Sequence, residues 1–309
     1  MTSVTTQITT SKKRGLPVVS NPPPAPQRPS WLRVRAPSGK NYEQLRQLVE
    51  NKHLHTVCAS ASCPNMGECW ERGTATFMIL GNTCSRACRF CHVDSGRPDP
   101  VDLQEPQRLA QAAALMQLRH VVITSVARDD LPDGGAGHFA HCLQAVHEQL
   151  PQAKLEVLVP DFAGEQQSIA TVLEPSLSVF NHNLETVKRL TPRVRSKATY
   201  ERSLHVLATA KRLAPHIQTK SGLMLGLGEQ LSEVQQALHD LRSAGVSIVT
   251  LGQYLRPSPR HTPMDRFVPP EEFDQMAVFA RSLGFIHVES GPLVRSSYHA
   301  ERAVSHTRF

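Results

Sequence analysis

Thr74-Ala-Thr-Phe-Met-Ile-Leu80-Gly-Asn-Thr-Cys84-Ser-Arg-Ala-Cys88-Arg-Phe-Cys91 joins an apolar, strand-like run to three closely spaced cysteines. β-Branched and aromatic residues between positions 74 and 80 favour a strand, and the first cysteine comes shortly after its end. In parallel α/β barrels, the loops at the carboxyl ends of the strands build the active site. The stretch therefore predicts a barrel whose first strand delivers three thiol groups to the active-site face.

The rest of the chain repeats this strand pattern in alternation with amphipathic helical patterns. Further apolar runs that predict strands lie at residues 120–126, 155–159, 177–180, 217–225, 248–254 and 285–289. The helical patterns include residues 106–118, 138–150, 200–213, 231–244 and 270–283. Strands that alternate with helices form parallel βαβ units, and about six of them predict an α/β fold. We expect a partial (β/α)6 barrel of the TIM type.

Local signals mark some of the helix ends. The run Leu231-Ser232-x-x-Gln235 has the pattern of a capping box, which starts a helix. Gly245 and Gly284 stand where helix C-caps are expected, because glycine adopts the left-handed conformation there without steric cost.

Outside the barrel, the chain divides into three flanking segments. Residues 1–30 are rich in Thr, Ser and Pro, which predicts a disordered tail. Residues 31–73 form an N-terminal extension that carries three more cysteines, residues 74–291 form the barrel, and residues 292–309 form a C-terminal extension. The tail is poor in acids and only weakly similar to an organellar transit peptide. The expected location is the cytoplasm, or an organelle if the tail is a transit segment.

The charge balance is basic, but it does not indicate one class of partner. The 34 Lys and Arg residues exceed the 27 Asp and Glu residues, which gives a formal net charge of +7. We find no Lys/Arg-rich run interleaved with aromatics, and aromatic content is only 5%, so a nucleic-acid partner is not expected. No apolar run approaches the roughly 20 residues that span a bilayer, so no membrane contact is expected either.

Cysteine usage is the unusual feature of the composition. Six of the seven cysteines fall between Cys58 and Cys91. An odd total and the absence of a secretory h-region argue against a disulfide framework. Clustered thiols in a reducing compartment indicate metal binding instead. Cys142 lies alone in a helical pattern and is expected to be a small core residue.

Cys84, Cys88 and Cys91 suit an iron–sulfur cluster better than zinc. Three thiolates at this spacing can hold three corners of a cubane cluster and leave one iron open for a non-protein ligand. A zinc ion with His92 as fourth ligand is the alternative. It lacks the usual second cysteine pair, and His92 directly follows Cys91, which makes joint tetrahedral ligation awkward.

A first triplet, Cys58-x4-Cys63-x5-Cys69, precedes the barrel and forms a separate candidate site. Free cysteines rarely cluster without a metal or redox reason, so three purely structural thiols are not favoured. Three ligands again leave a cluster one protein ligand short. A fourth must come from elsewhere in the chain.

The motifs together resemble a known family. The spacing Cys84-x3-Cys88-x2-Cys91 is similar to the cluster motif of the radical S-adenosylmethionine superfamily. With the first triplet and Arg295-Ser-Ser-Tyr298, the chain resembles the lipoyl synthase family of that superfamily. The likeness covers nearly all of residues 31–302 and includes Trp31-Leu-Arg-Val, Thr124-Ser-Val-Ala-Arg128-Asp-Asp-Leu-Pro-Asp-Gly-Gly135-Ala, Phe180-Asn-His-Asn-Leu-Glu-Thr186, Lys220-Ser-Gly-Leu-Met-Leu-Gly-Leu-Gly-Glu229 and Gly252-Gln-Tyr-Leu-Arg-Pro-Ser-Pro-Arg260.

The resemblance implies two [4Fe–4S] clusters and S-adenosylmethionine as cofactors. Cys84, Cys88 and Cys91 would hold the cluster that cleaves S-adenosylmethionine to methionine and a 5′-deoxyadenosyl radical. The first triplet would hold an auxiliary cluster with Ser297 as fourth ligand, and the adjacent Ser296 stays open as the alternative. A hard serine oxygen beside soft thiolates gives a labile corner, and the resemblance implies that this cluster is the sulfur source.

The implied reaction inserts two sulfur atoms at C6 and C8 of an octanoyl chain that is amide-linked to a lysine. The implied partners are octanoylated carrier domains of 2-oxoacid dehydrogenase E2 subunits and of the glycine cleavage H protein, an electron donor and an iron–sulfur carrier. No acid, base or polar nucleophile removes hydrogen from an unactivated methylene. Distance control between the radical, the substrate carbon and the sulfur is therefore the central task of the fold.

Several polar residues carry weaker predictions. Asp133, with Asp129 and Asp130, is expected to cap the helix near His138 and form a turn, with ribose binding as the alternative. Glu229 could contact cofactor at a strand end or close an ordinary turn. Asn181 and Asn183 receive no role. Arg193, Arg195, Arg256 and Arg260 are candidates for carboxylate or carrier binding, with structural or solvated roles favoured for each.

The chain departs from the family pattern at a few positions. Ala127 stands where an Asp is usual, Lys188 where a Pro is usual, and Phe162-Ala-Gly-Glu165 replaces a more common Phe-Arg-Gly-Asp, although none removes a cluster ligand. They leave open a paralogue with a different carrier preference. The alternatives are another two-cluster enzyme that thiolates RNA bases or a small cofactor, and a non-enzymatic metal storage, transfer or sensing protein.

Overall fold

Parallel strands surround a central space in the computed structural model, which describes residues 27–33, 42–43, 46–47, 49, 54–60, 63, 65–71 and 74–300. Within this part of the chain, the main sheet has the order β1-β2-β5-β6-β7-β8-β9-β10, and every neighbouring pair from β2 onward is parallel. The parallel strands are β2 (Ala75–Ile79), β5 (His120–Ser125), β6 (Lys154–Leu158), β7 (Val179–Asn181), β8 (Gln218–Leu225), β9 (Ile248–Gln253) and β10 (His287–Gly291).

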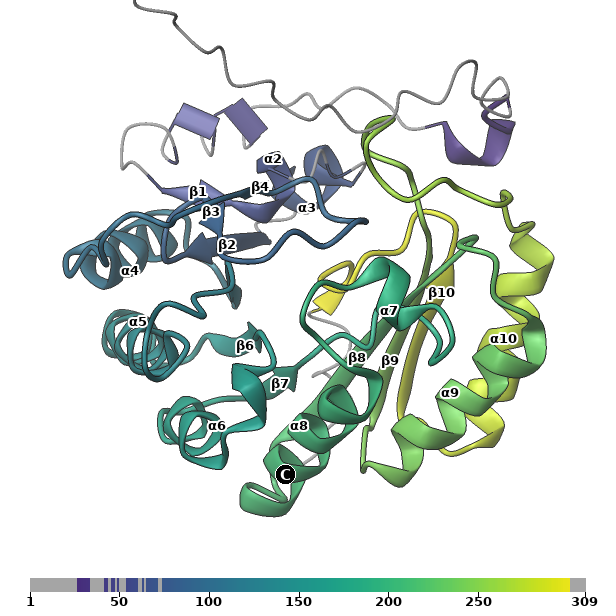
Figure 1. Cartoon of the computed structure of the whole chain (residues 1–309). Helices are drawn as coiled ribbons and strands as arrows, with labels where there is room; N and C mark the ends of the chain where they lie inside the picture. Colours follow the sequence, from purple (N-terminus) through teal and green to yellow (C-terminus); the bar gives the residue numbers. More distant parts are fainter. Residues whose placement is uncertain are drawn as a thin grey trace, which may run out of the picture.

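The fold is the predicted partial barrel. In the described residues β10 pairs only with β9, so the sheet does not close onto β2. Figure 1 shows the outer helices covering the convex face of this open barrel. These helices are α4 (Glu105–Leu115), α5 (Ala136–Gln149), α6 (Gln166–Leu173), α8 (Tyr200–Leu213), α9 (Leu231–Ser243) and α10 (Pro270–Ser282).

Each predicted strand is present, with ends shifted by a few residues, and so is each predicted barrel helix. Helix α6 is an additional helix that the sequence pattern did not single out. The capping box of α9 was misplaced: Gln230 is the N-cap, and its backbone N–H donates to the Glu233 carboxylate at 2.8 Å. Gly245 and Gly284 do follow helix ends at φ 83° and 85°.

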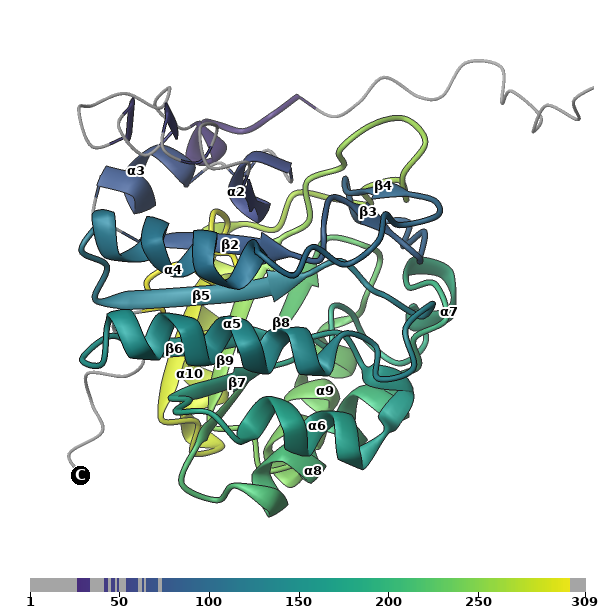
Figure 2. The same cartoon turned by 90° about the vertical axis from the view of Figure 1, so that its left-hand side faces the viewer.

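Shorter elements lie at the carboxyl ends of the barrel strands and in the N-terminal extension beside β2. Figure 2 shows β3 (Thr83–Cys84), β4 (Asp94–Ser95) and α7 (Thr191–Val194) together beyond the arrowheads of the strands, at their carboxyl ends. The N-terminal extension contributes η1 (Ser30–Leu32), α2 (Val57–Ser60), α3 (Met66–Glu71) and β1 (His55–Thr56), which pairs antiparallel with β2. The predicted tail lies outside the described residues apart from positions 27–30.

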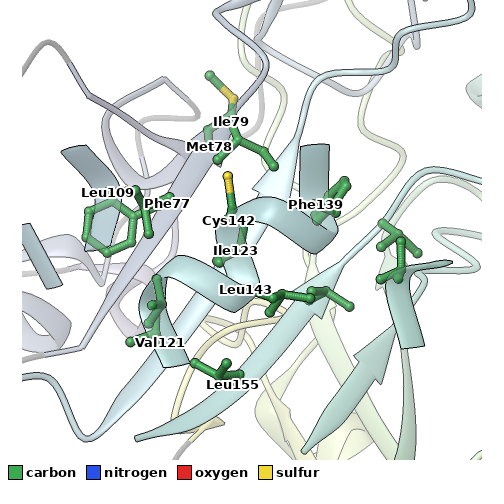
Figure 3. Packing of buried hydrophobic residues seen from close by; sticks show 14 of the residues in the cluster. Phe77, Met78, Ile79, Leu109, Val121, Ile123, Phe139, Cys142, Leu143 and Leu155 are labelled. Atoms are coloured by element: carbon green, nitrogen blue, oxygen red, sulfur yellow. The ribbon is translucent and has the colours of Figure 1, made fainter. Parts of the chain in front are cut away.

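The side chains of β2 alternate between two environments. Phe77 and Ile79 pack in the hydrophobic layer under α4 and α5, where Figure 3 labels them with Phe139 and Leu143 of α5. Cys142 lies in the same layer and is 0% exposed, which confirms it as a small core residue. Thr76 and Met78 face the other way and line a central cavity. The alternation places the strand between the core and the site.

The turn after β2 is held by three surrounding groups. Leu80 has φ 67°, a left-handed conformation that is uncommon for a bulky residue. A carboxylate oxygen of Glu105 accepts the Leu80 N–H at 2.9 Å and lies 2.7 Å from Nε2 of His138. Arg128 donates to the Leu80 carbonyl at 3.4 Å. Buried polar partners thus fix the direction in which the chain leaves the strand for the second cysteine triplet, Cys84, Cys88 and Cys91.

A hydrophobic span is not found in the part of the chain that the structure describes: its helices are too short or too polar to cross a bilayer.

Candidate active site

One cavity, with a volume of about 560 Å³, brings the predicted ligands together. Its lining residues come from the strands of the barrel, from the loops that follow them and from the N-terminal extension. All six cysteines of the two triplets line it, and so do both serines of the C-terminal motif: Cys58, Cys63, Cys69, Cys84, Cys88, Cys91, Ser296 and Ser297. Segments separated by more than two hundred residues in the chain therefore share one chamber.

Backbone N–H groups surround the sulfurs of the second triplet. Cys84 Sγ accepts from the N–H of Arg86 at 3.4 Å and from that of Ala127 at 3.3 Å. Cys88 Sγ accepts from the N–H of Ser196 at 3.4 Å. Hydrogen bonds to ligand sulfurs are among the features that set the reduction potential of an iron–sulfur cluster. The contact at Ala127 needs only a backbone group, so the missing Asp at this position does not remove it.

The loop of the second triplet is anchored by a buried cation. Arg86 Nη2 lies 2.6 Å from Oδ1 of Asp129 and 2.7 Å from Oδ1 of Asp161, and only 8% of its side chain is exposed. The Arg86 guanidinium lowers the pKa of Asp129 to about 2. Asp129 also fixes the loop through its N–H, which donates to Oγ of Ser85. Asp129 and Asp161 therefore position the loop between Cys84 and Cys88.

A second loop closes over the end of the triplet. Between β9 and α10, Nε2 of His261 lies 2.9 Å from the Cys91 carbonyl oxygen, and the Thr262 N–H donates to the Arg89 carbonyl at 2.7 Å. Arg256 lines the cavity, yet its guanidinium donates to carbonyls of its own loop, at His261 and Pro259. Its role in the structure is to shape this loop.

Two ionisable side chains near Cys88 line the cavity, and the sequence analysis named only Arg195 as a candidate. Arg195 lines the cavity and donates to Oγ of Ser203 at 2.6 Å. Glu185 lines it too, and burial raises the pKa of its carboxyl group. Glu185 was missed, although it lies in the stretch from Phe180 to Thr186 that resembles the family. Both side chains lie near enough to the thiol of Cys88 to influence it electrostatically.

Other candidates lie away from the cavity or serve the backbone. Asp133 accepts from the N–H groups of Gly135 and Gly137, at 2.8 and 2.7 Å, which confirms the predicted capping of α5. Glu229 accepts from the N–H groups of Gly226 and Leu227, so it closes the turn after β8. Of the remaining polar candidates, Asn183 lines the cavity. Three others do not line it: Asn181, Arg193 and Arg260.

The first triplet is held by two short helices next to β2. Cys58 lies in α2, Cys69 lies in α3, and Cys63 stands between these helices. Burial raises the pKa of the Cys58 thiol to about 11 and that of Cys91 in the other triplet to about 12; it raises the pKa values of Cys63 and Cys88 as well. Such thiols keep their protons at neutral pH until a metal displaces them. Their burial therefore disfavours free thiolate chemistry at these positions.

The two serines form the tip of a tight turn. The Tyr298 N–H donates to the Arg295 carbonyl at 2.9 Å, which places Ser296 and Ser297 at the two central positions. Asn65 Nδ2 donates to the carbonyl of Leu293 at 2.6 Å and ties the segment to the residues between Cys63 and Cys69. The C-terminal motif thus reaches the first triplet through contacts with the N-terminal extension.

The donor set fits iron–sulfur clusters better than a single metal ion. Among the described residues, no group of three or more His, Cys, Asp or Glu side chains lies close enough to hold one ion. The sulfurs instead surround a cavity large enough for bulkier groups. Zinc ligation by Cys84, Cys88, Cys91 and His92 is accordingly not supported. The cysteines that hold a cubane cluster bind separate iron atoms and need not converge on one ion.

Family models match the two parts of the chain separately. Residues 78–241 match the radical SAM superfamily. Residues 8–63 match the N-terminal domain of lipoyl synthase of the Radical_SAM family. The superfamily match contains Cys84, Cys88 and Cys91. The lipoyl synthase match contains Cys58 and Cys63.

Full-length relatives share half or more of the aligned residues. The chain is 55% identical over 294 residues to the lipoyl synthase of Nitrosococcus oceani, an alignment that covers 94% of this chain and 91% of that protein. It is 53% identical over 282 residues to the mitochondrial lipoyl synthase of Nematostella vectensis, covering 91% and 97%. Both bacterial and mitochondrial proteins are therefore similar to the chain over almost their whole lengths.

Solved structures share the fold at low identity. Streptococcus suis SuiB bound to S-adenosylmethionine has a TM-score of 0.56 at 7% identity, covering 73% of this chain and 53% of that one. HydG, a maturase of the [FeFe]-hydrogenase, has a TM-score of 0.52 at 12% identity, covering 84% and 74%. With the relatives above, the chain belongs to the lipoyl synthase family of the radical S-adenosylmethionine superfamily, whose members use two [4Fe–4S] clusters and S-adenosylmethionine to convert the octanoyl groups of lipoyl carrier domains into lipoyl groups.

Proposed function

We propose that the two cysteine triplets divide lipoyl synthesis between them. Cys84, Cys88 and Cys91 hold the cluster that binds and cleaves S-adenosylmethionine. Cys58, Cys63 and Cys69, completed by Ser297, hold the auxiliary cluster that supplies sulfur. The observation that carries this division is the single cavity, because both triplets and the serine turn line the same chamber. A substrate carbon inside it can face both sets of ligands without leaving the protein.

When bound, S-adenosylmethionine and the two clusters would supply a 5′-deoxyadenosyl radical and sulfide. The residues of the chain would position the reacting groups and exclude water. Glu185 and Arg195 stand beside Cys88, where they can hold the charged ends of S-adenosylmethionine. Met78, Leu158 and Met224 line the same cavity with apolar surface, which suits an acyl chain. Apolar walls also exclude water, and this protects a carbon radical from side reactions.

Ser297 is assigned as the fourth ligand on two grounds. It lines the cavity with the first triplet, and the resemblance of Arg295-Ser-Ser-Tyr298 assigns this position. Ser296 lines the cavity as well and remains the alternative ligand. A hydroxyl oxygen is a hard donor and binds iron less firmly than a thiolate does, which suits an iron that must leave.

We propose the same division of labour for the segments of the chain. Residues 31–73 carry the auxiliary ligands, residues 74–291 form the radical barrel, and residues 292–309 deliver the serine. The separate family matches at residues 8–63 and 78–241 support a boundary between the first two segments. The match beginning at residue 8 also indicates that part of the predicted tail, residues 1–30, belongs with the N-terminal segment.

The carrier domains are proposed to be those of 2-oxoacid dehydrogenase E2 subunits and of the glycine cleavage H protein. An electron donor and an iron–sulfur carrier are required as well, because the reaction consumes both electrons and sulfur. A cytoplasmic location fits the bacterial relatives, and an organelle fits the mitochondrial one.

An anaerobic assay of two cysteine variants tests the division. The reconstituted protein receives S-adenosylmethionine, dithionite and an octanoyl-lysine peptide, and both 5′-deoxyadenosine and lipoyl peptide are measured. We expect Cys58→Ala to form 5′-deoxyadenosine without thiolated peptide, and Cys88→Ala to form neither product. Loss of 5′-deoxyadenosine formation in Cys58→Ala would show that the triplets do not divide the reaction in this way.

A further inference from the structure

We propose that Glu68 is a positioning residue that clasps the serine turn onto helix α3, and that this clasp controls how firmly the fourth corner of the auxiliary cluster is held. The inference rests on the proposed assignment of Ser297 and the first triplet to that cluster. It adds a residue that binds neither metal nor substrate.

One carboxylate engages both residues that follow the serine ligand. Tyr298 donates its hydroxyl proton to Oε2 of Glu68 at 3.1 Å, and Nε2 of His299 lies 3.6 Å from Oε1. The rings of Tyr298 and His299 stack with centroids 3.8 Å apart. Because Glu68 directly precedes Cys69 in α3, the carboxylate joins the serine turn to the backbone that carries a cluster ligand.

Two further contacts fix the segment on either side of the turn. Before the turn, Asn65 holds the Leu293 carbonyl at 2.6 Å. Beyond it, Nδ1 of His299 lies 3.8 Å from Oε2 of Glu289 on β10. Asn65 and Glu68 therefore attach the segment to the N-terminal extension by hydrogen bonds, while His299 only lies close to Glu289 of the barrel.

The backbone of the segment needs such external contacts. His299 has φ 51°, a conformation that costs free energy for a residue with a side chain. The hydrogen bond from Tyr298 to Arg295 shapes the turn itself, but it does not place the turn over the cysteines. The position of Ser297 relative to Cys69 thus depends on contacts between segments, and Glu68 supplies one of them through Tyr298, the residue after Ser297.

The clasp matters because the serine is a weak ligand. An oxygen donor beside thiolates gains less from binding iron, so its occupancy depends more on being held in place. Glu68 and Cys69 are adjacent, so a movement of α3 displaces the clasp and a ligand together. Loss of the clasp is expected to leave the three cysteine ligands in place and to loosen the serine corner alone.

Iron release from the auxiliary cluster tests the clasp without relying on turnover. The test uses the full chain with Cys84, Cys88 and Cys91 changed to Ala, so that only the auxiliary cluster is reconstituted. Release of the corner iron as Fe²⁺ to a ferrous chelator is followed anaerobically, and samples are then oxidised by one electron with ferricyanide so that the remaining [3Fe–4S]⁺ cluster is seen by electron paramagnetic resonance. We expect Tyr298→Phe and Glu68→Ala to release this iron about five- to tenfold faster, as loss of a charge-assisted hydrogen bond predicts.

Conservative and matched variants separate positioning from general damage. Glu68→Gln keeps an oxygen that accepts from Tyr298, so it should release iron more slowly than Glu68→Ala. Tyr42→Phe removes a hydroxyl from a ring that packs on Trp70 in the same extension, and should match the parent. In a Ser297→Cys background, a firmly bound thiolate should suppress the effect of Tyr298→Phe.

The outcomes distinguish the clasp from the assignment on which it rests. If neither Ser296→Ala nor Ser297→Ala speeds iron release, the serine ligand itself is wrong. If a serine variant speeds release but Tyr298→Phe and Glu68→Ala do not, the clasp is wrong and the ligand assignment stands. Equal acceleration by Tyr298→Phe in the Ser297→Cys background would mean that the change acts on the fold rather than through the serine, which also overturns the clasp.

Discussion

The Glu105 carboxylate accepts the backbone N–H of Leu80 at 2.9 Å, at the point where the first barrel strand leads into the cysteine loop. The same oxygen lies 2.7 Å from Nε2 of His138, so one buried acid joins the strand end to α5. Leu80 holds a left-handed conformation in this turn. The direction of the loop that carries Cys84 therefore depends on a side chain in α4.

Removing this acid should both destabilise the protein and loosen the loop. Glu105→Ala leaves a buried N–H and a buried histidine without their partner, and we expect a loss of about 2–4 kcal/mol in the free energy of unfolding. Urea unfolding measures it. Glu148→Ala, an exposed acid on α5, should stay within about 0.5 kcal/mol of the parent. An unchanged urea midpoint in Glu105→Ala would show that the turn is stable without it.

Arg86 should behave as one half of a buried ion pair. Arg86→Met leaves Asp161, whose side chain is 0% exposed, with one cation at 3.3 Å, Arg202, and with the backbone N–H of Ala163 at 3.2 Å. We expect Arg86→Met to lower the free energy of unfolding by about 3–5 kcal/mol. Adding Asp161→Asn should recover part of this loss, because the unpaired charge is then gone. A double-mutant cycle by urea unfolding gives the coupling, and strict additivity would contradict a direct pair.

Acid should remove the contribution of Asp129. Arg86 lowers the pKa of this carboxyl group to about 2 in the folded state, below its ordinary value of 3.8. A lowered pKa gives stability that is full above the ordinary value and is lost as the pH falls from about 4 to about 2. The difference in unfolding free energy between the parent and Asp129→Asn should therefore shrink over this window. A difference that stays constant would mean that the pKa is not shifted.

Gly252 should be needed for the C-terminal segment to cross the barrel. A Cβ at this position would collide with the Val294 carbonyl oxygen, which is part of the backbone and cannot turn aside. We expect Gly252→Ala to form 5′-deoxyadenosine but to lose at least tenfold in lipoyl peptide, because a displacement of about 1 Å costs that much.

Gly291 provides the matched control for Gly252. It is the register partner of Gly252 on the neighbouring strand, and an added Cβ would make only an ordinary 3.6 Å contact with Val294. Gly291→Ala should therefore retain lipoyl peptide formation. Equal losses in the two variants would point to the strands rather than to the crossing segment.

Cys142 should tolerate apolar replacement but not a polar one. It lies fully buried in the layer between β2 and α5. Cys142→Ser buries a hydroxyl and should cost about 1–3 kcal/mol, while Cys142→Ala should cost less than about 2 kcal/mol. Both variants should bind as much iron as the parent after reconstitution. Reduced iron in Cys142→Ala would assign this cysteine to a cluster.

The sequence alone determined the barrel and predicted the cluster ligands. Strands and helices were readable because each buries one face, so the apolar residues recur at fixed periods. The six cysteines were readable because thiols at short spacing have few uses besides metal binding. The C-cap glycines at positions 245 and 284 were readable for a local reason, since a positive φ favours glycine. The capping box of α9 was misplaced because two overlapping patterns compete within six residues.

The tertiary structure decided which of these groups meet. No periodicity in the chain shows that Glu68 and Tyr298, 230 residues apart, share a hydrogen bond, or that Glu185 lies near the thiol of Cys88. The tertiary structure also decided that Glu229 closes a turn and that Arg195 lines the cavity. Short-range patterns report on backbone conformation and burial, which depend on neighbouring residues. Contacts between distant segments depend on how whole elements pack, and the common chamber of the two triplets exists only once the extensions have folded onto the barrel.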